Sequence, residues 1–138
     1  MLTTRSRLRG ERGQSLVEFA LVSPLFFLTL FGAIEFGLAV WQYNMIADLA
    51  QEGARWASVR GSTAGTAATN GTVQTYVQGR ALGIVPTVTT TWPDGGSPAN
   101  LPGKRVQVVV TKNFVFALPI MGSGSVPLQS RAQMIIAR

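Results

Sequence analysis

The sequence lacks two residue types on which much protein chemistry depends. Its 138 residues include no cysteine and no histidine. This excludes a disulfide framework, a thiolate nucleophile and a cysteine-ligated metal, and it removes the commonest zinc ligand and the commonest general base. The six acidic residues are scattered, mostly in the N-terminal half, so a paired-carboxylate hydrolase has little to work with. We therefore expect no catalytic residue, no metal and no cofactor, and the composition argues against an enzyme.

Positive charge is concentrated at one end of the chain. Twelve basic and six acidic residues give a net charge of +6, but four of the arginines lie in the first twelve positions. Without residues 1–13, eight bases and five acids would remain, a net charge of +3. These bases are dispersed and form no stripe of the kind that phosphate binding requires, so nucleic acid is not an expected partner.

Charged residues are scarce overall, at 13%, whereas apolar residues make up 46%. A typical soluble domain has about 25% charged residues. The apolar excess lies between Leu16 and Trp41, and residues 19–41, at about 1.5 Å each, are long enough to cross the roughly 30 Å of hydrocarbon in a bilayer. We predict a basic leader over residues 1–13, a transmembrane apolar helix over residues 14–43 and an extracytoplasmic α+β domain over residues 44–138.

The arginines of the leader predict the orientation of this helix. By the positive-inside rule they place the N-terminus in the cytoplasm, so the chain would be a single-pass protein of the cell membrane with its C-terminal domain outside. A secretory signal peptide is the alternative, but its apolar run is about 7–15 residues long and ends at an A-x-A-like site. Here the best small-x-small site, residues 37–39, leads into further apolar residues.

Glu18 stands at the head of the apolar run, where a signal peptide has no use for a carboxylate. An ionised carboxylate in hydrocarbon costs about 2.5 kcal/mol or more unless it is paired or held near an interface. Glu18 lies five residues after Gly13, about 7 Å along a helix that starts there. A positive partner at this depth would be the amine of a chain that starts at residue 14, either its own or a neighbour's.

These residues carry a resemblance. The segment Gly13-Gln-Ser-Leu-Val-Glu18-Phe19, between a basic leader and a long apolar helix, resembles the prepilin-peptidase site of type IV pilins. This form of the motif, and the later Gly53-Ala54-Arg55, are similar to the TadE-like minor pilins of the tight-adherence (Flp) pilus system. The resemblance implies a pilin-like fold and a role as a minor pilin or pseudopilin, because the major pilins of that system are much shorter.

The resemblance also implies a processing site and partners. Cleavage would fall between Gly13 and Gln14, and the catalytic carboxylates would belong to the prepilin peptidase, a membrane aspartyl protease. Glu18 and Phe19 would register the subunits. The implied partners are the prepilin peptidase, other pilin subunits, inner-membrane assembly proteins and membrane lipid.

Three further residues stand out in the apolar helix. Pro24 removes a backbone donor and is expected to kink the helix, which membrane helices tolerate. The kink is also a candidate site of unwinding when a pilin moves from the bilayer into a filament. Ala33 and Gly37, four residues apart, form a small-xxx-small face that would let another helix approach closely.

The remaining pattern predicts an α+β fold. We expect one helix over residues 14–59, a loop over residues 61–71, and a short helix over residues 72–83, capped by Asn70 or Thr72 and stopped by Gly83. Arg80 is expected to be solvated. Alternating runs over residues 84–92, 106–116 and 128–136 predict a three-stranded antiparallel sheet whose apolar face is formed by the even-numbered positions.

Two other functions remain open at this point. The first is an uncleaved single-pass membrane protein whose outer domain binds a ligand or partner. The second is an enzyme with a serine and lysine pair, for which Lys104 and Lys112 are the available lysines, although no nearby serine is singled out.

Overall fold

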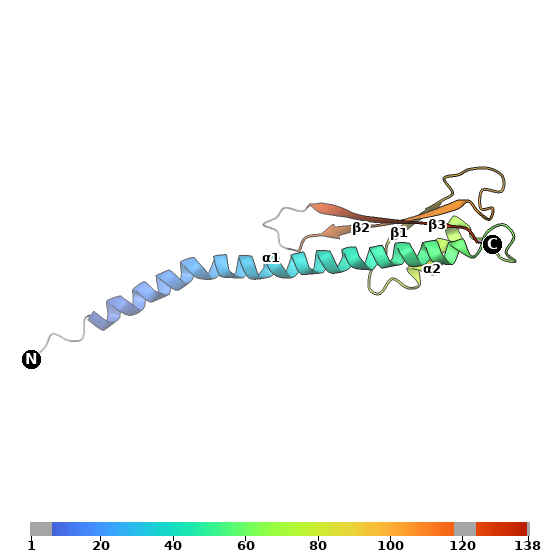
Figure 1. Cartoon of the computed structure of the whole chain (residues 1–138). Helices are drawn as coiled ribbons and strands as arrows, with labels where there is room; N and C mark the ends of the chain where they lie inside the picture. The colour runs from blue at the N-terminus through green and yellow to red at the C-terminus, as the bar shows by residue number, and fades with distance from the viewer. Residues whose placement is uncertain (1–6, 118–123, 138) are drawn as a thin grey trace, which may run out of the picture. The chain divides into compact units, whose positions relative to one another are not determined.

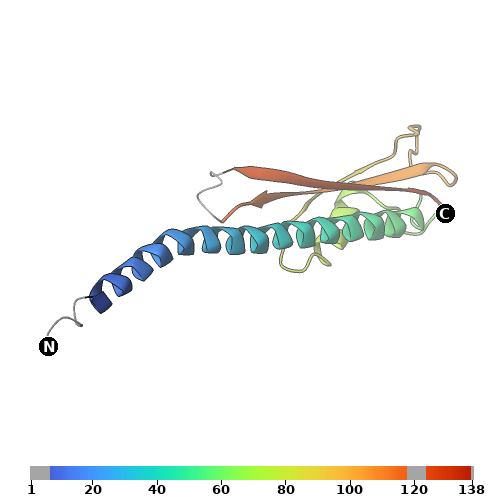
Figure 2. The same ribbon diagram turned by 60° about the vertical axis from the view of Figure 1, so that its left-hand side comes forward.

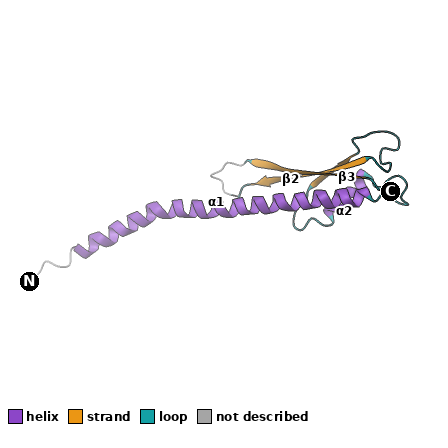
Figure 3. Ribbon diagram, in the orientation of Figure 1, coloured by secondary structure: helices purple, strands orange, loops and turns teal. Residues whose placement is uncertain are grey.

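The computed structural model describes residues 7–117 and 124–137, with side chains from Gly13 onward in these ranges. The elements follow in the order α1 (Arg7–Ser58), α2 (Asn70–Gln78), β1 (Thr87–Thr91), β2 (Arg105–Val115) and β3 (Ser125–Ile135), as Figures 1 and 3 show. The strands form one antiparallel sheet in the order β1-β2-β3. The predicted α+β class, with a long N-terminal helix, a short helix and a three-stranded antiparallel sheet, is confirmed.

The chain divides into two compact units, residues 1–37 and residues 38–138, and the boundary falls within α1. The first unit contributes the apolar part of α1. The second unit, here called the outer unit, contains the rest of α1, α2 and the sheet. Each unit is described by itself below.

Helix α1 begins earlier than predicted and ends almost where predicted. It starts at Arg7 and not at residue 14, because leucine, arginine and glutamate favour helix while Gly10 and Gly13 each cost only about 1 kcal/mol. Residues 1–6 of the predicted leader lie outside the described residues. The helix ends at Ser58, where Arg60 N donates to Ala57 O at 3.0 Å and the chain turns.

Helix α2 is shorter than the prediction and is capped by a different residue. The Thr69 side chain accepts from Thr72 N, and the Thr72 side chain accepts from Thr69 N, so the two threonines form a reciprocal capping box. The helix ends at Gln78 rather than Gly83, with Gly79 as its C-cap. The Asn70 side chain, one of the predicted caps, instead accepts from Thr90 N at 2.9 Å and so links α2 to the outer edge of β1.

The sheet shows the predicted alternation. In β2 the even-numbered Val106, Val108, Val110 and Phe114 are buried, and their odd-numbered neighbours are more exposed. The strand bounds differ from the prediction by one residue at four ends and by three residues at the starts of β1 and β3. β1 starts at Thr87, since Pro86 has no N–H to donate to a ladder. β3 starts at Ser125, because the hairpin pairing extends to Val115↔Ser125. Most of the predicted linker between these strands, residues 118–123, lies outside the described residues.

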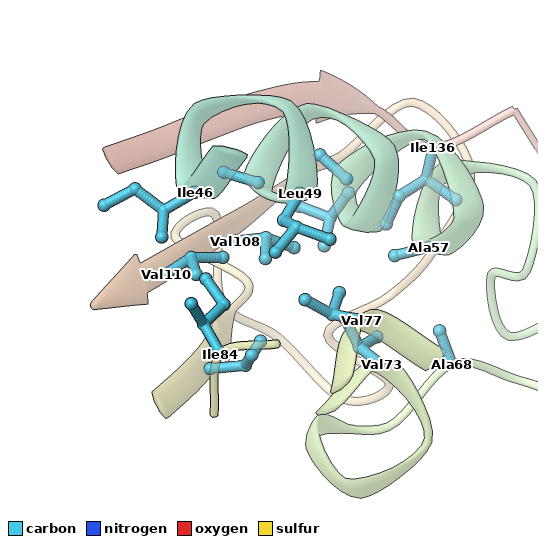
Figure 4. Close-up of a cluster of buried hydrophobic side chains, with 14 residues drawn as sticks. Ile46, Leu49, Ala57, Ala68, Val73, Val77, Ile84, Val108, Val110 and Ile136 are labelled. Carbon is cyan, nitrogen blue, oxygen red and sulfur yellow. The ribbon is translucent and has the colours of Figure 1, made fainter. Parts of the chain in front are cut away.

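The core of the outer unit lies between α1, α2 and the sheet. Ile46, Leu49 and Ala57 come from α1, Val73 and Val77 from α2, and Val108 and Val110 from β2, as Figure 4 shows. Ile136, directly after β3, is 1% exposed, and its backbone bonds reciprocally to the segment before β2. Ala137, the residue before the last of the chain, donates its N–H to Ser58 O at 2.8 Å. The end of the chain is thereby tied to the end of α1.

The connection from β1 to β2 is closed by Asp94. Its carboxylate accepts from the backbone N of Arg105 at 2.7 Å and from the Arg105 guanidinium, with Nη2 to Oδ1 at 2.5 Å. The hydrogen bonds from the Arg105 side chain and backbone hold the pKa of Asp94 below its ordinary value of 3.8. Lys104 Nζ donates to Gly95 O at 2.5 Å, and this hydrogen bond also stabilises the turn.

Candidate functional site

Gly13 lies inside the helical backbone of α1. A Cβ atom built on Gly13 would meet no atom within 4 Å, so nothing packs against the helix at this position. Glycine is also among the weakest helix formers, and Gly10 lies one turn earlier. The first turns of α1 are therefore its easiest part to unwind.

Gln14 and Glu18 lie one turn apart and contact each other directly. Gln14 Nε2 donates to Glu18 Oε1 at 3.0 Å, and both side chains are exposed. Phe19, the next residue, is 68% exposed. The structure thus brings together three of the residues that the sequence singled out, on the first exposed turns after Gly13.

The apolar residues that follow are exposed throughout the first unit. They include Leu21, Phe26, Phe31 and Ile34, all at least 46% exposed. Within the described residues, one helix, Gly13–Ser58, is long and apolar enough to cross a membrane. A surface that is apolar all round a helix is unfavourable in water and is typical of a membrane span. The apolar N-terminal helix is thus consistent with a single membrane span.

The other singled-out positions lie on this same helix. α1 continues through Pro24, and Thr29 Oγ1 donates to Leu25 O at 2.9 Å within the following turn. Ala33 and Gly37 are exposed, and a Cβ atom on Gly37 would meet nothing within 4 Å. These small residues leave an open face on which another helix could lie.

Gly53 has the opposite environment. A Cβ atom there would lie 2.7 Å from Val77 Cγ2 and 3.3 Å from Val108 Cγ1, so α1 and α2 can approach this closely only because residue 53 is glycine. Ala54, next to it, is fully buried, and Arg55 is exposed in the last turn of α1. The motif Gly53-Ala54-Arg55 therefore marks the point where α1 packs closely against α2 and β2.

Sequence reasoning missed a stack of side chains beside Gly53. The guanidinium of Arg60 lies 4.2 Å from the Trp56 ring centroid, Trp56 stacks on Tyr76 at 5.0 Å, and the guanidinium of Arg80 lies 4.7 Å from the Tyr76 ring. Glu52 accepts from Tyr76 Oη at 3.4 Å and forms an ion pair with Arg80. Arg80 is exposed, as predicted, and its guanidinium also pairs with Glu52 and so links the end of α2 to α1.

The signal for this stack was present in the sequence but incomplete. Glu52 and Trp56 lie four residues apart on α1, with Arg60 four residues further on, just past the end of the helix; Tyr76 of α2 and Arg80, just past the end of α2, have the same spacing. Such spacing places side chains on one helix face. It does not say which two faces meet, and this is why the stack could not be predicted.

Among the described residues, no group of three or more His, Asp or Glu residues is placed to hold a metal ion. The groove beside the stack, about 460 Å³ in volume, is lined by Asp48, Glu52, Arg55, Trp56 and Tyr76 among others. Charged and aromatic side chains of α1 and α2 thus lie side by side along this groove.

Comparison with known proteins gives one match. The profile of the TadE-like protein family matches residues 13–55, from the glycine before Gln14 to the arginine of the Gly-Ala-Arg motif. No curated protein and no solved structure matches the chain.

Proposed function

We propose that this chain, whose residues 13–55 match the TadE-like protein family, is a minor pilin, or pseudopilin, of a tight-adherence (Flp-type) pilus. In this proposal a prepilin peptidase removes residues 1–13, and the mature chain acts in assembly or structure of the pilus. The observation that carries the proposal is the placement of Gly13, Gln14 and Glu18 at the start of an exposed apolar helix.

The chain's part in the cleavage is to present a peptide bond. The peptidase would supply the catalytic carboxylates, and this chain would supply the Gly13–Gln14 bond, which lies in a weak helical segment and carries no side chain at Gly13. Local unwinding of the first turns would expose the bond to the peptidase at modest cost. Cleavage then leaves a new α-amine on Gln14.

This amine would change the environment of Glu18. In the uncleaved chain Glu18 accepts from the neutral side-chain amide of Gln14. An ammonium group on Gln14, from the same chain or a neighbour, would replace this bond with a charge-assisted one, which is roughly twice as strong. Because an unpaired carboxylate near hydrocarbon is costly, Glu18 would favour a neighbour at one fixed height. Phe19 would pack beside it.

The rest of the apolar helix would serve membrane residence and subunit packing. The leader arginines would hold the N-terminus in the cytoplasm, and the outer unit would lie on the extracytoplasmic side. Ala33 and Gly37 would face a neighbouring helix, and Pro24 would ease unwinding on transfer to a filament. The partners would be the prepilin peptidase, other pilin subunits, inner-membrane assembly proteins and membrane lipid.

The test is the intact mass of the chain from membranes with and without the matching prepilin peptidase. We expect loss of residues 1–13 in its presence and no loss for Gly13→Asp, which places a charged side chain at the cut. Gly10→Asp, the same change three residues upstream, is the matched control and should still be cut. Retention of Met1–Gly13 by the wild-type chain beside an active peptidase contradicts the proposal.

Glu18→Ala separates processing from assembly. We expect this variant to be cut but to fail in assembly, because the subunits lose the partner of the Gln14 amine. Normal piliation by Glu18→Ala would remove the role proposed for this carboxylate.

One observation favours the alternative of an uncleaved single-pass protein with a partner-binding outer domain. Helix α1 runs without interruption from Arg7 through the Gly13–Gln14 bond, so the bond must first unwind to be cut. The same mass measurement decides between the two functions.

A further inference from the structure

Two apolar side chains of the outer unit are unusually exposed. Leu82 and Val85 are 76% and 79% exposed, more than any other large apolar residue in the described part of the chain, including those of the apolar helix. Both lie in the segment that joins α2 to β1. In water, the exposure of two large apolar side chains in one short loop is unfavourable, and an apolar surrounding would bury them.

The loop presents these side chains in a fixed way. Ile84, between them, is 8% exposed and belongs to the core, so it anchors the loop from within. Gly83 has φ +73°, a left-handed conformation that glycine adopts freely and that reverses the chain at this point. Gln78 Nε2 donates to Pro86 O at 3.2 Å and closes the base of the loop. The exposure of Leu82 and Val85 is therefore built into the loop.

The loop lies beside the outer end of the apolar run. Leu82 lines a cleft of about 300 Å³ together with Trp41 and Met45 of α1. Trp41 is the last residue of the predicted 23-residue span, and Tyr43 follows it; both are about half exposed. Tryptophan and tyrosine at the end of a span are typical of the membrane–water interface.

The charged residues near the loop lie outside the loop itself. No charged residue occurs between Arg80 and Asp94. The same cleft is also lined by Asn44, Asp48, Leu49, Glu52 and Arg80. Asp48 and Glu52 lie about 10–17 Å further along α1 than Trp41, at about 1.5 Å per residue. The charged residues that α1 contributes to the cleft thus lie further from the span than Trp41 does.

We propose that the loop over residues 81–86 inserts Leu82 and Val85 into the outer interface of the membrane that α1 spans. The loop and the helix together would then hold the outer unit against the lipid surface. The inference rests on the membrane span of the proposed function. Burial of one leucine or valine side chain favours the inserted state by about ten-fold or more.

The absence of cysteine makes a direct test clean, because one introduced cysteine carries the only label. Full-length chains with Leu82→Cys, Phe27→Cys or Thr66→Cys are labelled with an environment-sensitive fluorophore. They are reconstituted in phosphatidylcholine and phosphatidylglycerol vesicles that contain spin-labelled lipid. Phe27 reports on the span, and Thr66, an exposed residue of the α1–α2 loop, reports on a water-facing position.

We expect a blue shift and lipid quenching at positions 82 and 27 but not at 66. Quenching at 27 without quenching at 82 overturns the loop proposal and leaves the span intact. Loss of quenching at 27 means that the span itself is wrong. A label at 82 that is shielded from aqueous iodide but not quenched by lipid indicates a neighbouring subunit as the occupant, and this also overturns the proposal.

A second label tests the side chains themselves. In a Val85→Cys chain, Leu82→Asp should abolish lipid quenching at position 85, because a carboxylate would have to enter the interface. Leu82→Ile, which keeps the size and apolar character, should preserve it. Equal quenching in the two chains would contradict the role of Leu82.

Discussion

The apolar residues of the continuous helix α1 lie in two different environments. In residues 13–37 they are exposed, up to 74% for Leu21, whereas in the part of α1 within the outer unit Ile46, Ala50 and Ala54 are fully buried. Figure 2 shows this second part of α1 running along the sheet. A helix that is apolar all round needs an apolar solvent, and a helix with one apolar face needs a protein core. The burial pattern, and not the length of the helix, marks where the apolar part of α1 gives way to a protein core.

The largest expected difference between the two parts of α1 comes from placing the same negative charge in each of them. Ile46→Asp buries an unpaired carboxylate in the core and should cost at least about 3 kcal/mol, enough to unfold the outer unit. Leu28→Asp should leave the outer unit folded in detergent but disfavour membrane insertion by about 2.5–3.5 kcal/mol. Near-UV circular dichroism in micelles reports the first effect, and carbonate extraction of membranes reports the second.

The difference between the two parts would be contradicted if each of the two aspartate variants had the effect expected of the other. If Leu28→Asp unfolds the outer unit, the first part of α1 belongs to the same core. Ile46→Val is the control for the core position and should cost only about 0.5–1.5 kcal/mol.

Glycine substitutions sharpen the comparison at the level of packing. Gly53→Leu must displace Val77 and Val108 and should destabilise the outer unit by about 1–3 kcal/mol, measured as thermal unfolding in detergent. Gly37→Leu meets open space and should leave that unfolding transition unchanged. An equal loss for both variants would show that residue 37 also packs against the core.

The sequence predicted best where one periodicity applied over a long segment. The alternation in β2 placed Val106, Val108 and Val110 on the buried face, because a strand that is wet on one side allows no other arrangement. The end of α1 at Ser58 followed from the end of its apolar stripe. Glu18 could be singled out because a carboxylate at the head of an apolar run is a local signal, whereas Gly13 and Gln14 were singled out through the resemblance to a prepilin-peptidase site, and their role stays a prediction.

The prediction failed where several local signals competed or where two elements meet. Thr69, Asn70 and Thr72 are all acceptable caps, and only the packing of α2 against β1 decides that Asn70 bonds Thr90 instead. Gly79 and Gly83 are both acceptable helix stops. The structure uses the first as the stop and the second, with its positive φ, to turn the loop that carries Leu82.

Two tryptophans of α1 also differ in environment, and their replacement is expected to change the stability by a smaller amount. Trp56 lies between Arg60 and Tyr76, so Trp56→Ala should destabilise the outer unit by about 2 kcal/mol through lost stacking and cation–π contacts. Trp41→Ala removes a half-exposed side chain and should change the stability in detergent by at most about 0.5 kcal/mol. Chemical denaturation followed by Tyr and Trp fluorescence measures both; a larger loss for Trp41→Ala would contradict the assignment of Trp41 to the interface.

The smallest effect concerns a carboxylate in the water-facing unit. The Arg105 hydrogen bonds lower the pKa of Asp94 in the folded chain, so the folded state favours the ionised form and gains stability from it above pH 3.8, the ordinary value. This gain is lost as the pH falls through the lowered pKa. The melting temperature of wild type should therefore exceed that of Asp94→Asn near pH 7, and the difference should vanish in stronger acid. Arg105→Gln should show the same loss near pH 7, and the double variant should add little to it, because either change removes the one pair that closes the β1–β2 turn. A difference that persists in strong acid would mean that Asp94 acts through its shape and backbone contact rather than its charge.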